Sequence, residues 1–140
     1  MKNTELKRAR DRALYQAFKR LLAQGGYPTM RQAASAVCRC PAPRFFIEPE
    51  NASLLVGCIL NGVSLDDRNM GTRRMASQLH ALYLQWLEDN PGSRMSRERI
   101  MEIIVEMPAP EFYIGAQSAR KIIYRERKKA RARWDRWREI

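Results

Sequence analysis

The sequence has no long apolar run, and this absence excludes a membrane-spanning protein. Its longest strongly apolar stretch, residues 54–60 (LLVGCIL), is far shorter than a span of about 20 residues. The first twelve residues, MKNTELKRARDR, lack the apolar segment of a secretory signal peptide. The apolar content of 45% argues against general disorder. We therefore expect a folded cytoplasmic protein with no membrane partner.

Residues that commonly carry out catalysis are scarce in this chain. His80 is the single histidine, and the sequence contains no glycine-rich phosphate loop, no HExxH motif and no GxSxG motif. The adjacent carboxylates Asp66 and Asp67 lie in a stretch that we expect to form a turn or to precede a helix. Two neighbouring carboxylates alone form neither a metal site nor an acid–base pair. We expect no enzymatic activity and no catalytic residue.

Cysteine is also rare, with Cys38, Cys40 and Cys58 only. An odd number without a signal peptide favours reduced thiols over disulfides. These cysteines and His80 would make four zinc ligands, but their spacing matches no standard zinc finger. We expect buried or inert thiols, with no metal and no cofactor.

Acidic residues are few, and the excess of basic residues is confined to the two ends. The chain has 26 basic and 15 acidic residues, a net charge of +11. Residues 1–24 carry +5 and residues 119–140 carry +7, whereas residues 25–118 carry −1. A nearly neutral body with two basic ends favours a polyanionic partner. Arginine outnumbers lysine 20 to 6, and its planar fork suits phosphate.

A sequence motif occurs twice. Residues 41–47 read PAPRFFI and residues 108–114 read PAPEFYI, an offset of 67 residues, and the flanking apolar positions match in the same order. With one inserted residue, Leu14 and Phe18 align with Leu82 and Trp86. We interpret this pattern as two degenerate copies of one supersecondary unit. In each copy the prolines should end a helix, and the aromatic and isoleucine side chains should anchor the loop in the core.

The apolar periodicity and the helix-ending residues predict an all-α fold with three helices in each copy. The expected helices are 4–24, 30–39 and 49–60 in the first copy, and 72–89, 97–107 and 116–140 in the second. The domains are then 1–62, a first three-helix repeat serving as scaffold; 63–71, a linker; and 72–140, a second repeat with a long basic C-terminal helix. A 60-residue unit is marginally stable alone, so we expect the two to share one core and form one compact domain.

The third helices of the two copies differ in character. Residues 49–60 are almost wholly apolar, which predicts a helix that is buried all round. Residues 116–140 become basic beyond Tyr124, which favours contacts with phosphates. The candidate nucleic-acid-binding residues are Lys7, Arg8, Gln117, Arg120, Lys121, Arg125, Lys128, Lys129, Arg131, Arg133, Arg136 and Arg138. Gln117, Arg120 and Lys121, at the start of this helix, are the candidates for contacts with bases.

Trp134 and Trp137 continue the helical face that contains Ile123, with heptad-like spacing. This face predicts packing on another helix, for which residues 4–24 are one candidate. It also fits an oligomer seam, in which the face packs on a second copy of the chain. Base stacking or membrane anchoring is the other interpretation. Whether the basic helices at the two ends of the chain are neighbours cannot be read from the sequence.

The pair of helices joined by each PAPxF[FY]I loop resembles a helix-turn-helix, although the connection of about nine residues exceeds the usual three or four. Residues 108–123 also resemble a motif in small helical proteins of bacterial mobile elements. That resemblance implies an accessory role near the element's DNA and transfers no site residue.

These observations lead to one functional hypothesis and one alternative. We expect a small bacterial protein that binds nucleic acid, DNA ahead of RNA, with a regulatory or mobile-element accessory role. The alternative is a protein-interaction or oligomerisation module that uses the helical face of Trp134 and Trp137. A homodimer is one form of this alternative.

Overall fold

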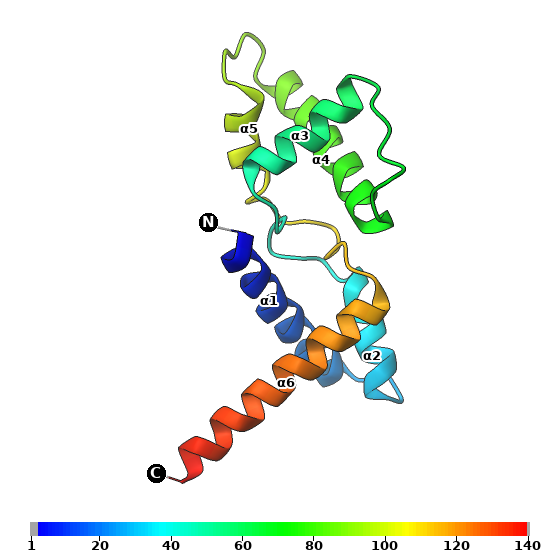
Figure 1. Cartoon of the computed structure of the whole chain (residues 1–140), viewed down its shortest axis with the longest axis vertical. Coiled ribbons are helices and arrows are strands. Elements are labelled where there is room, and N and C mark those ends of the chain that lie inside the picture. Colours follow the sequence, from blue (N-terminus) through cyan, green and yellow to red (C-terminus); the bar gives the residue numbers. More distant parts are fainter. Residues whose placement is uncertain (1–2, 140) are drawn as a thin grey trace. The chain divides into compact units, whose positions relative to one another are not determined.

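The computed structural model describes residues 3–139, and within them all regular secondary structure is helical (Figure 1). The α-helices are α1 (Asn3–Gln24), α2 (Met30–Ala36), α3 (Pro49–Leu60), α4 (Met70–Asp89), α5 (Arg97–Ile104) and α6 (Ala116–Arg138), and a short 3₁₀ helix η1 (Val37–Arg39) follows α2. The all-α prediction is confirmed. Residue 140, the last of the predicted 116–140 helix, lies outside the described residues.

Local sequence signals account for where these helices begin and end. Thr29 and Ser96 accept hydrogen bonds at the N-termini of α2 and α5, from the backbone N–H groups of Gln32 (3.1 Å) and Arg99 (3.2 Å). These caps satisfy amides that have no partner within the helix. Gly25, just past α1, has a φ of +77°, which glycine adopts without steric cost. Helix α4 begins two residues earlier than predicted because Asn69 caps it.

The N-terminal cap of α5 should contribute measurably to stability. Replacing Ser96 by alanine leaves the Arg99 amide without this acceptor, so we expect the free energy of unfolding to fall by about 1 kcal/mol. Urea unfolding followed by circular dichroism measures this loss. Ser77→Ala is a suitable control, because Ser77 is exposed in the interior of α4 and caps no helix. An equal loss in both variants would contradict the capping role.

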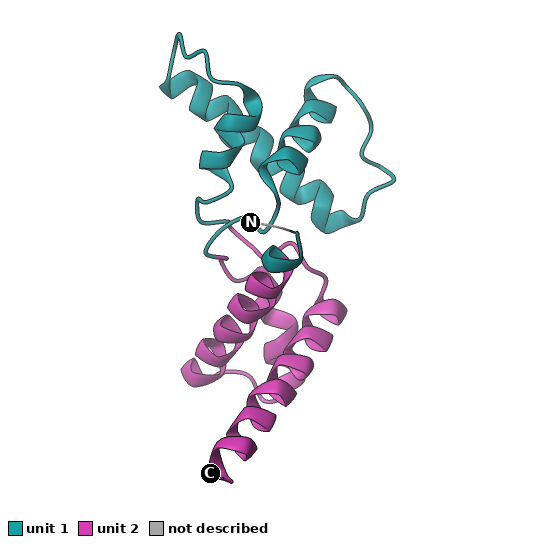
Figure 2. Cartoon of the chain, turned by 60° about the vertical axis from the view of Figure 1, so that its left-hand side comes forward, with its two compact units in different colours: residues 1–6, 43–109 teal, residues 7–42, 110–140 magenta. Residues whose placement is uncertain are grey.

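The chain forms two compact units, and each combines segments from both halves of the sequence (Figure 2). Unit 1 comprises residues 1–6 and 43–109, and unit 2 comprises residues 7–42 and 110–140. In unit 1, α3 packs against α4 and α5. In unit 2, α6 packs against α2 and η1. The third helix of each sequence repeat therefore packs with the second helix of the other repeat.

Backbone hydrogen bonds of the two PAPxF[FY]I loops have the same arrangement. In unit 1 the Phe45 N–H donates to the Val105 carbonyl (2.9 Å), and in unit 2 the Phe112 N–H donates to the Cys38 carbonyl (3.3 Å). Donors and acceptors are each separated by the 67 residues of the sequence repeat. Each loop thus bonds to the end of the second helix of the opposite repeat.

The buried positions follow the same offset. From Ile100 onward ten apolar residues are buried, and nine of the residues 67 positions before them are also buried: Ala33, Ala34, Val37, Cys38, Ala42, Phe45, Ala52, Leu55 and Val56 match Ile100, Met101, Ile104, Val105, Ala109, Phe112, Ala119, Ile122 and Ile123. The first aromatic residue of each loop, Phe45 or Phe112, is therefore a core residue, as the motif predicted. The tenth residue, Ile114, corresponds to the partly buried Ile47.

Helix α3 departs from the prediction that it is buried all round. Ala52, Leu55 and Val56 are buried, but Leu54 is 65% exposed and Leu60 is 45% exposed. A helix that packs on neighbours along one side leaves its opposite side to solvent even when that side is apolar. On the buried side, a Cβ added at Gly57 would lie 2.8 Å from a guanidinium nitrogen of Arg97, so the end of that side chain would have to move.

Each PAPxF[FY]I loop joins two helices that resemble a helix-turn-helix in sequence, but the two helices of each pair belong to different units. Helix α2 is in unit 2 and α3 in unit 1, whereas α5 is in unit 1 and α6 in unit 2. Helices α2 and α3, like α5 and α6, therefore do not form one packed unit as the two helices of that motif do.

Candidate nucleic-acid interface

The fold divides charge unequally between the units. Unit 2 contains 18 basic and 5 acidic residues, a net charge of +13, whereas unit 1 contains 8 basic and 10 acidic residues, a net charge of −2. Both basic ends of the sequence, apart from residues 1–6, belong to unit 2. The excess positive charge of the protein is therefore concentrated in unit 2, which contains about half of the residues.

A buried carboxylate joins α1 to α6. Asp11 is 6% exposed and accepts charge-assisted hydrogen bonds from Arg10 on its own helix (3.0 Å) and Arg125 on α6 (2.7 Å). At the corresponding position 68 residues later stands Leu79, which is fully buried. The ion pair between Asp11 and Arg125 joins α1 to α6. The basic helices at the two ends of the chain are therefore neighbours.

A groove of about 410 Å³ lies between α1 and α6 in unit 2. Its lining residues are Arg8, Asp11, Arg12, Tyr15, Gln16 and Lys19 from α1, and Glu126, Lys129, Ala130 and Arg133 from α6. The α1 residues recur at intervals of three and four, so they share one helical face. Arg8, Lys129 and Arg133 were predicted site residues. Arg12 and Lys19 were not among them, although this spacing was visible in the sequence.

The groove has an acidic floor and a basic rim. Glu126 is 8% exposed and pairs with Lys129 at 3.3 Å, just as Asp11 pairs with its two arginines. The two buried carboxylates are thus neutralised by their own partners. On the rim, Arg8, Arg12 and Arg133 have no ion-pair partner among residues 3–139. Their guanidinium groups are available to an external anion.

Lys19 and Tyr15 form the end of this rim. The Lys19 ammonium lies 5.1 Å from the centroid of the Tyr15 ring, a cation–π contact that holds the lysine over the aromatic face. A second, smaller hollow of about 180 Å³ on another face of α6 is lined by Tyr124, Arg127, Lys128 and Arg131. Basic residues therefore surround α6 on more than one side.

The first turns of α6 are held within the fold. Arg120 donates to the Ser35 hydroxyl on α2 (3.1 Å), and Ala119, Ile122 and Ile123 are buried. Gln117 and Lys121, the other residues expected to contact bases, are exposed. Arg120 therefore differs from Gln117 and Lys121, because its guanidinium group already has a hydrogen-bond partner within the protein.

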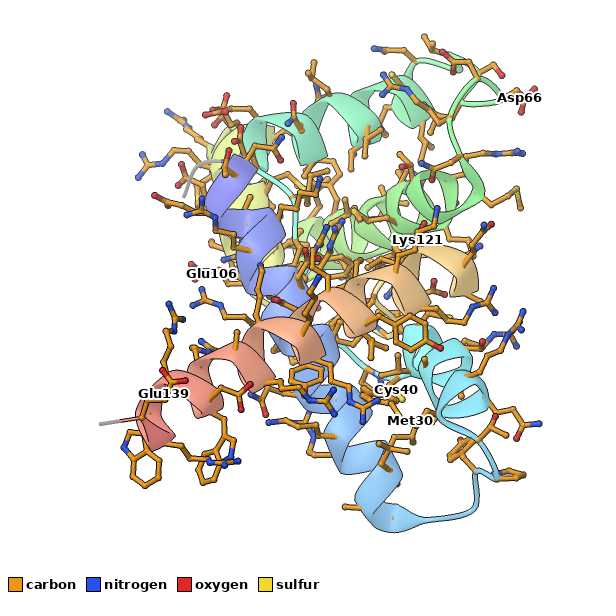
Figure 3. The ribbon with its side chains drawn as sticks, turned by 60° about the horizontal axis from the view of Figure 1, so that its bottom comes forward. Met30, Cys40, Asp66, Glu106, Lys121 and Glu139 are labelled. Carbon is orange, nitrogen blue, oxygen red and sulfur yellow. The ribbon has the colours of Figure 1, made fainter. Side chains whose placement is uncertain are left out.

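The second half of α6 has a different environment. Every residue from 131 to 139 is exposed, and the helix crosses α1 and projects beyond it towards Glu139 (Figures 1 and 3). We call residues 131–138 the arm. The arm carries four of the predicted site residues, Arg131, Arg133, Arg136 and Arg138, and both tryptophans. Lys7, on α1, is also exposed.

The predicted seam divides into a buried and an exposed part. Ile123 is fully buried, whereas Trp134 and Trp137 are 56% and 66% exposed. Their rings stack on each other, with centroids 5.2 Å apart and planes at 24°. Within the described chain their main aromatic contact is therefore with one another, and no neighbouring helix covers them.

The three thiols differ in burial, and the reactive form of Cys40 is disfavoured. Cys38 is buried, and Cys38, Cys40 and Cys58 are all free. Burial raises the pKa of Cys40 above its usual value of 9.0, and the neighbouring Cys38 adds to this effect more than Arg20 opposes it. The thiolate, the reactive and metal-binding form, is thus disfavoured. Among residues 3–139 no three metal-binding side chains cluster.

No protein-family model matches this chain, and neither the curated proteins nor the solved structures include a match to it. None of the helices in the described part of the chain is long and apolar enough to cross a membrane.

Proposed function

We propose that this protein binds nucleic acid, with double-stranded DNA preferred over RNA, and that unit 2 makes the contacts. The observation that carries the proposal is the concentration of a net charge of +13 on one unit, around helices α1 and α6. Basic charge clustered on one face or along a helix is the electrostatic footprint of a polyanion-binding protein. Arginine supplies most of this charge and binds phosphate in a bidentate manner.

The geometry supports contacts with several phosphates of one backbone. Arg8 and Arg12 on α1 and Arg133 on α6 border the same groove, while the arm extends the basic surface along α6. The buried carboxylates have internal partners, so they oppose an approaching phosphate less than free carboxylates would. Contacts with the phosphate backbone position a protein on DNA without recognising the base sequence. The resemblance of residues 108–123 to proteins of bacterial mobile elements supports a regulatory or accessory role near such DNA.

Fluorescence anisotropy with a labelled random-sequence duplex tests the proposal. Neutralising about six to eight phosphates should give a slope of log K against log salt of roughly −5 to −7 between about 50 and 300 mM salt. The same titration with single-stranded RNA of equal length provides the comparison. Absence of duplex binding at about 50 mM salt would contradict the proposal, because electrostatic binding is strongest there.

The exposed tryptophan pair supports a second candidate function, a homodimer or protein-interaction module. Trp134 and Trp137 present a large aromatic surface on the arm, and aromatic residues are enriched in protein interfaces. Sedimentation of the full chain distinguishes this function: a dimer that Trp134→Ala/Trp137→Ala dissociates would support it. A monomer at all concentrations would exclude the homodimer.

A further inference from the structure

We infer that the arm enters the major groove of duplex DNA and that the Trp134–Trp137 pair contacts thymine methyl groups there. This inference rests on the proposed function and adds to it the element that reads the DNA and the chemical group that is read. It assigns to the arm the role that the sequence suggested for the start of α6.

The arm has the dimensions and the exposure of a groove-binding helix. Its eight residues, all exposed, span about 12 Å at 1.5 Å per residue. An α-helix with side chains is about 10–12 Å wide, and the major groove of B-DNA is about 12 Å wide. The start of α6 is different, because Ala119, Ile122 and Ile123 are buried in unit 2. The arm, by contrast, is exposed at every residue, and Arg133 near its start borders the groove with α1.

The order of side chains around the arm matches the groove. At 3.6 residues per turn, Trp134 and Trp137 form a central stripe. Arg131 and Arg138 fall on one side of this stripe, and Arg133 and Arg136 on the other. A helix in the major groove has a phosphate backbone on each side and base edges in front. Arginines on both flanks of an apolar stripe therefore meet the two backbones while the stripe faces the bases.

The apolar stripe has one natural partner in that groove. Thymine presents its 5-methyl group there, and apolar side chains recognise it. The stacked rings keep the pair together, since they already contact each other at 5.2 Å. Each methyl group buried against the rings should raise the affinity about fourfold, by the transfer free energy of one such group.

Charge argues against a second copy of the chain as the occupant of this stripe. The arm contains four arginines and one aspartate, Asp135, so two arms side by side bring like charges together. Repulsion of this kind opposes pairing, whereas an anionic duplex attracts both flanks. The stripe is also narrow, because arginines border it on both sides, and a membrane-surface helix needs a broad apolar face.

Uracil-containing DNA provides the experiment, because replacing thymine by uracil removes the methyl group and keeps the base-pairing edge. Anisotropy is measured with an A·T-rich duplex and with its uracil counterpart, at one salt concentration. We expect the full chain to bind the thymine duplex about 16-fold more tightly, for two methyl contacts of about fourfold each. The variant Trp134→Ala/Trp137→Ala should bind both duplexes equally and keep the salt slope of the full chain.

A matched control is Leu54→Ala/Leu60→Ala, which removes exposed apolar side chains from α3 of unit 1. This variant should keep the thymine preference. Equal binding of both duplexes by the full chain would overturn the inference, as would a tryptophan variant that retains the preference. Both results leave the proposed function standing if binding depends on salt. Failure to bind either duplex at low salt would instead overturn the proposed function and the inference together.

Discussion

Glutamine in place of Arg8, Arg12, Arg133 and Arg136 should weaken duplex binding about 4000-fold at about 0.1 M salt and reduce the salt slope by about 3.6. The estimate assigns one phosphate to each arginine, since each contact contributes about 0.9 to the slope. These arginines come from α1 and α6, and none has an ion-pair partner among the described residues. Salt-dependent anisotropy measures both quantities.

Unit 1 offers a control with the same change in net charge. Glutamine at Arg68, Arg73, Arg94 and Arg99 removes four positive charges from the unit whose net charge is −2. We expect this variant to lose less than tenfold in affinity, because only long-range attraction is reduced and salt screens it within about 10 Å at 0.1 M. Glutamine is a good helix former, so both variants should keep their helices. Similar losses in the two variants would show that net charge, and not unit 2, determines binding.

Alanine at Ile104 and alanine at Ile123 should each lower the free energy of unfolding by about 3 kcal/mol, but in different units. Both residues are fully buried and both belong to the second sequence repeat. Ile104 lies on α5, which packs on α3 and α4, whereas Ile123 lies on α6, which packs on α2. The two cavities therefore open in different cores.

Hydrogen exchange separates the two effects. Ile104→Ala should increase amide exchange in α3, α4 and α5, and Ile123→Ala should increase it in α1, α2 and α6, because local opening follows the packed unit. The unaffected unit serves as the internal control for each variant. Increased exchange confined to residues 72–140 in both variants would show that each sequence repeat packs by itself. Only Ile123→Ala should also weaken DNA binding, because it loosens the helix that carries the arm.

The helices themselves were predictable because their signals are local. Pro49 opens α3 at the first turn, Ser96 caps α5, and Gly25 follows α1 in a left-handed conformation. Each of these effects involves residues within about four positions, so a single sequence shows them. The boundaries of α1 and α3 agree with the prediction within one residue. The 97–107 helix ends earlier, at Ile104, with its last residues in a turn before Pro108.

The candidate site was predictable only in part. The sequence identified Arg8, Lys129 and Arg133 as basic and amphipathically placed, but not as neighbours. Asp11, the residue that joins α1 to α6, gave no signal of its role, because a lone aspartate in a basic helix resembles any solvated residue. Arg120 was expected to face DNA, and its bond to Ser35 depends on a helix 85 positions away. Long-range contacts of this kind have no local pattern.

The sequence by itself determined the all-α class, the helix ends and the repeated apolar positions. Only the tertiary structure decided which helices pack together. Because the buried positions of the two repeats correspond, the third helix of either repeat presents an equivalent apolar face to either partner, and no local preference distinguishes the two pairings. The pairing adopted places α6 with α1 and α2 in unit 2. This choice, made by packing across the whole chain, collects the two basic ends into one surface.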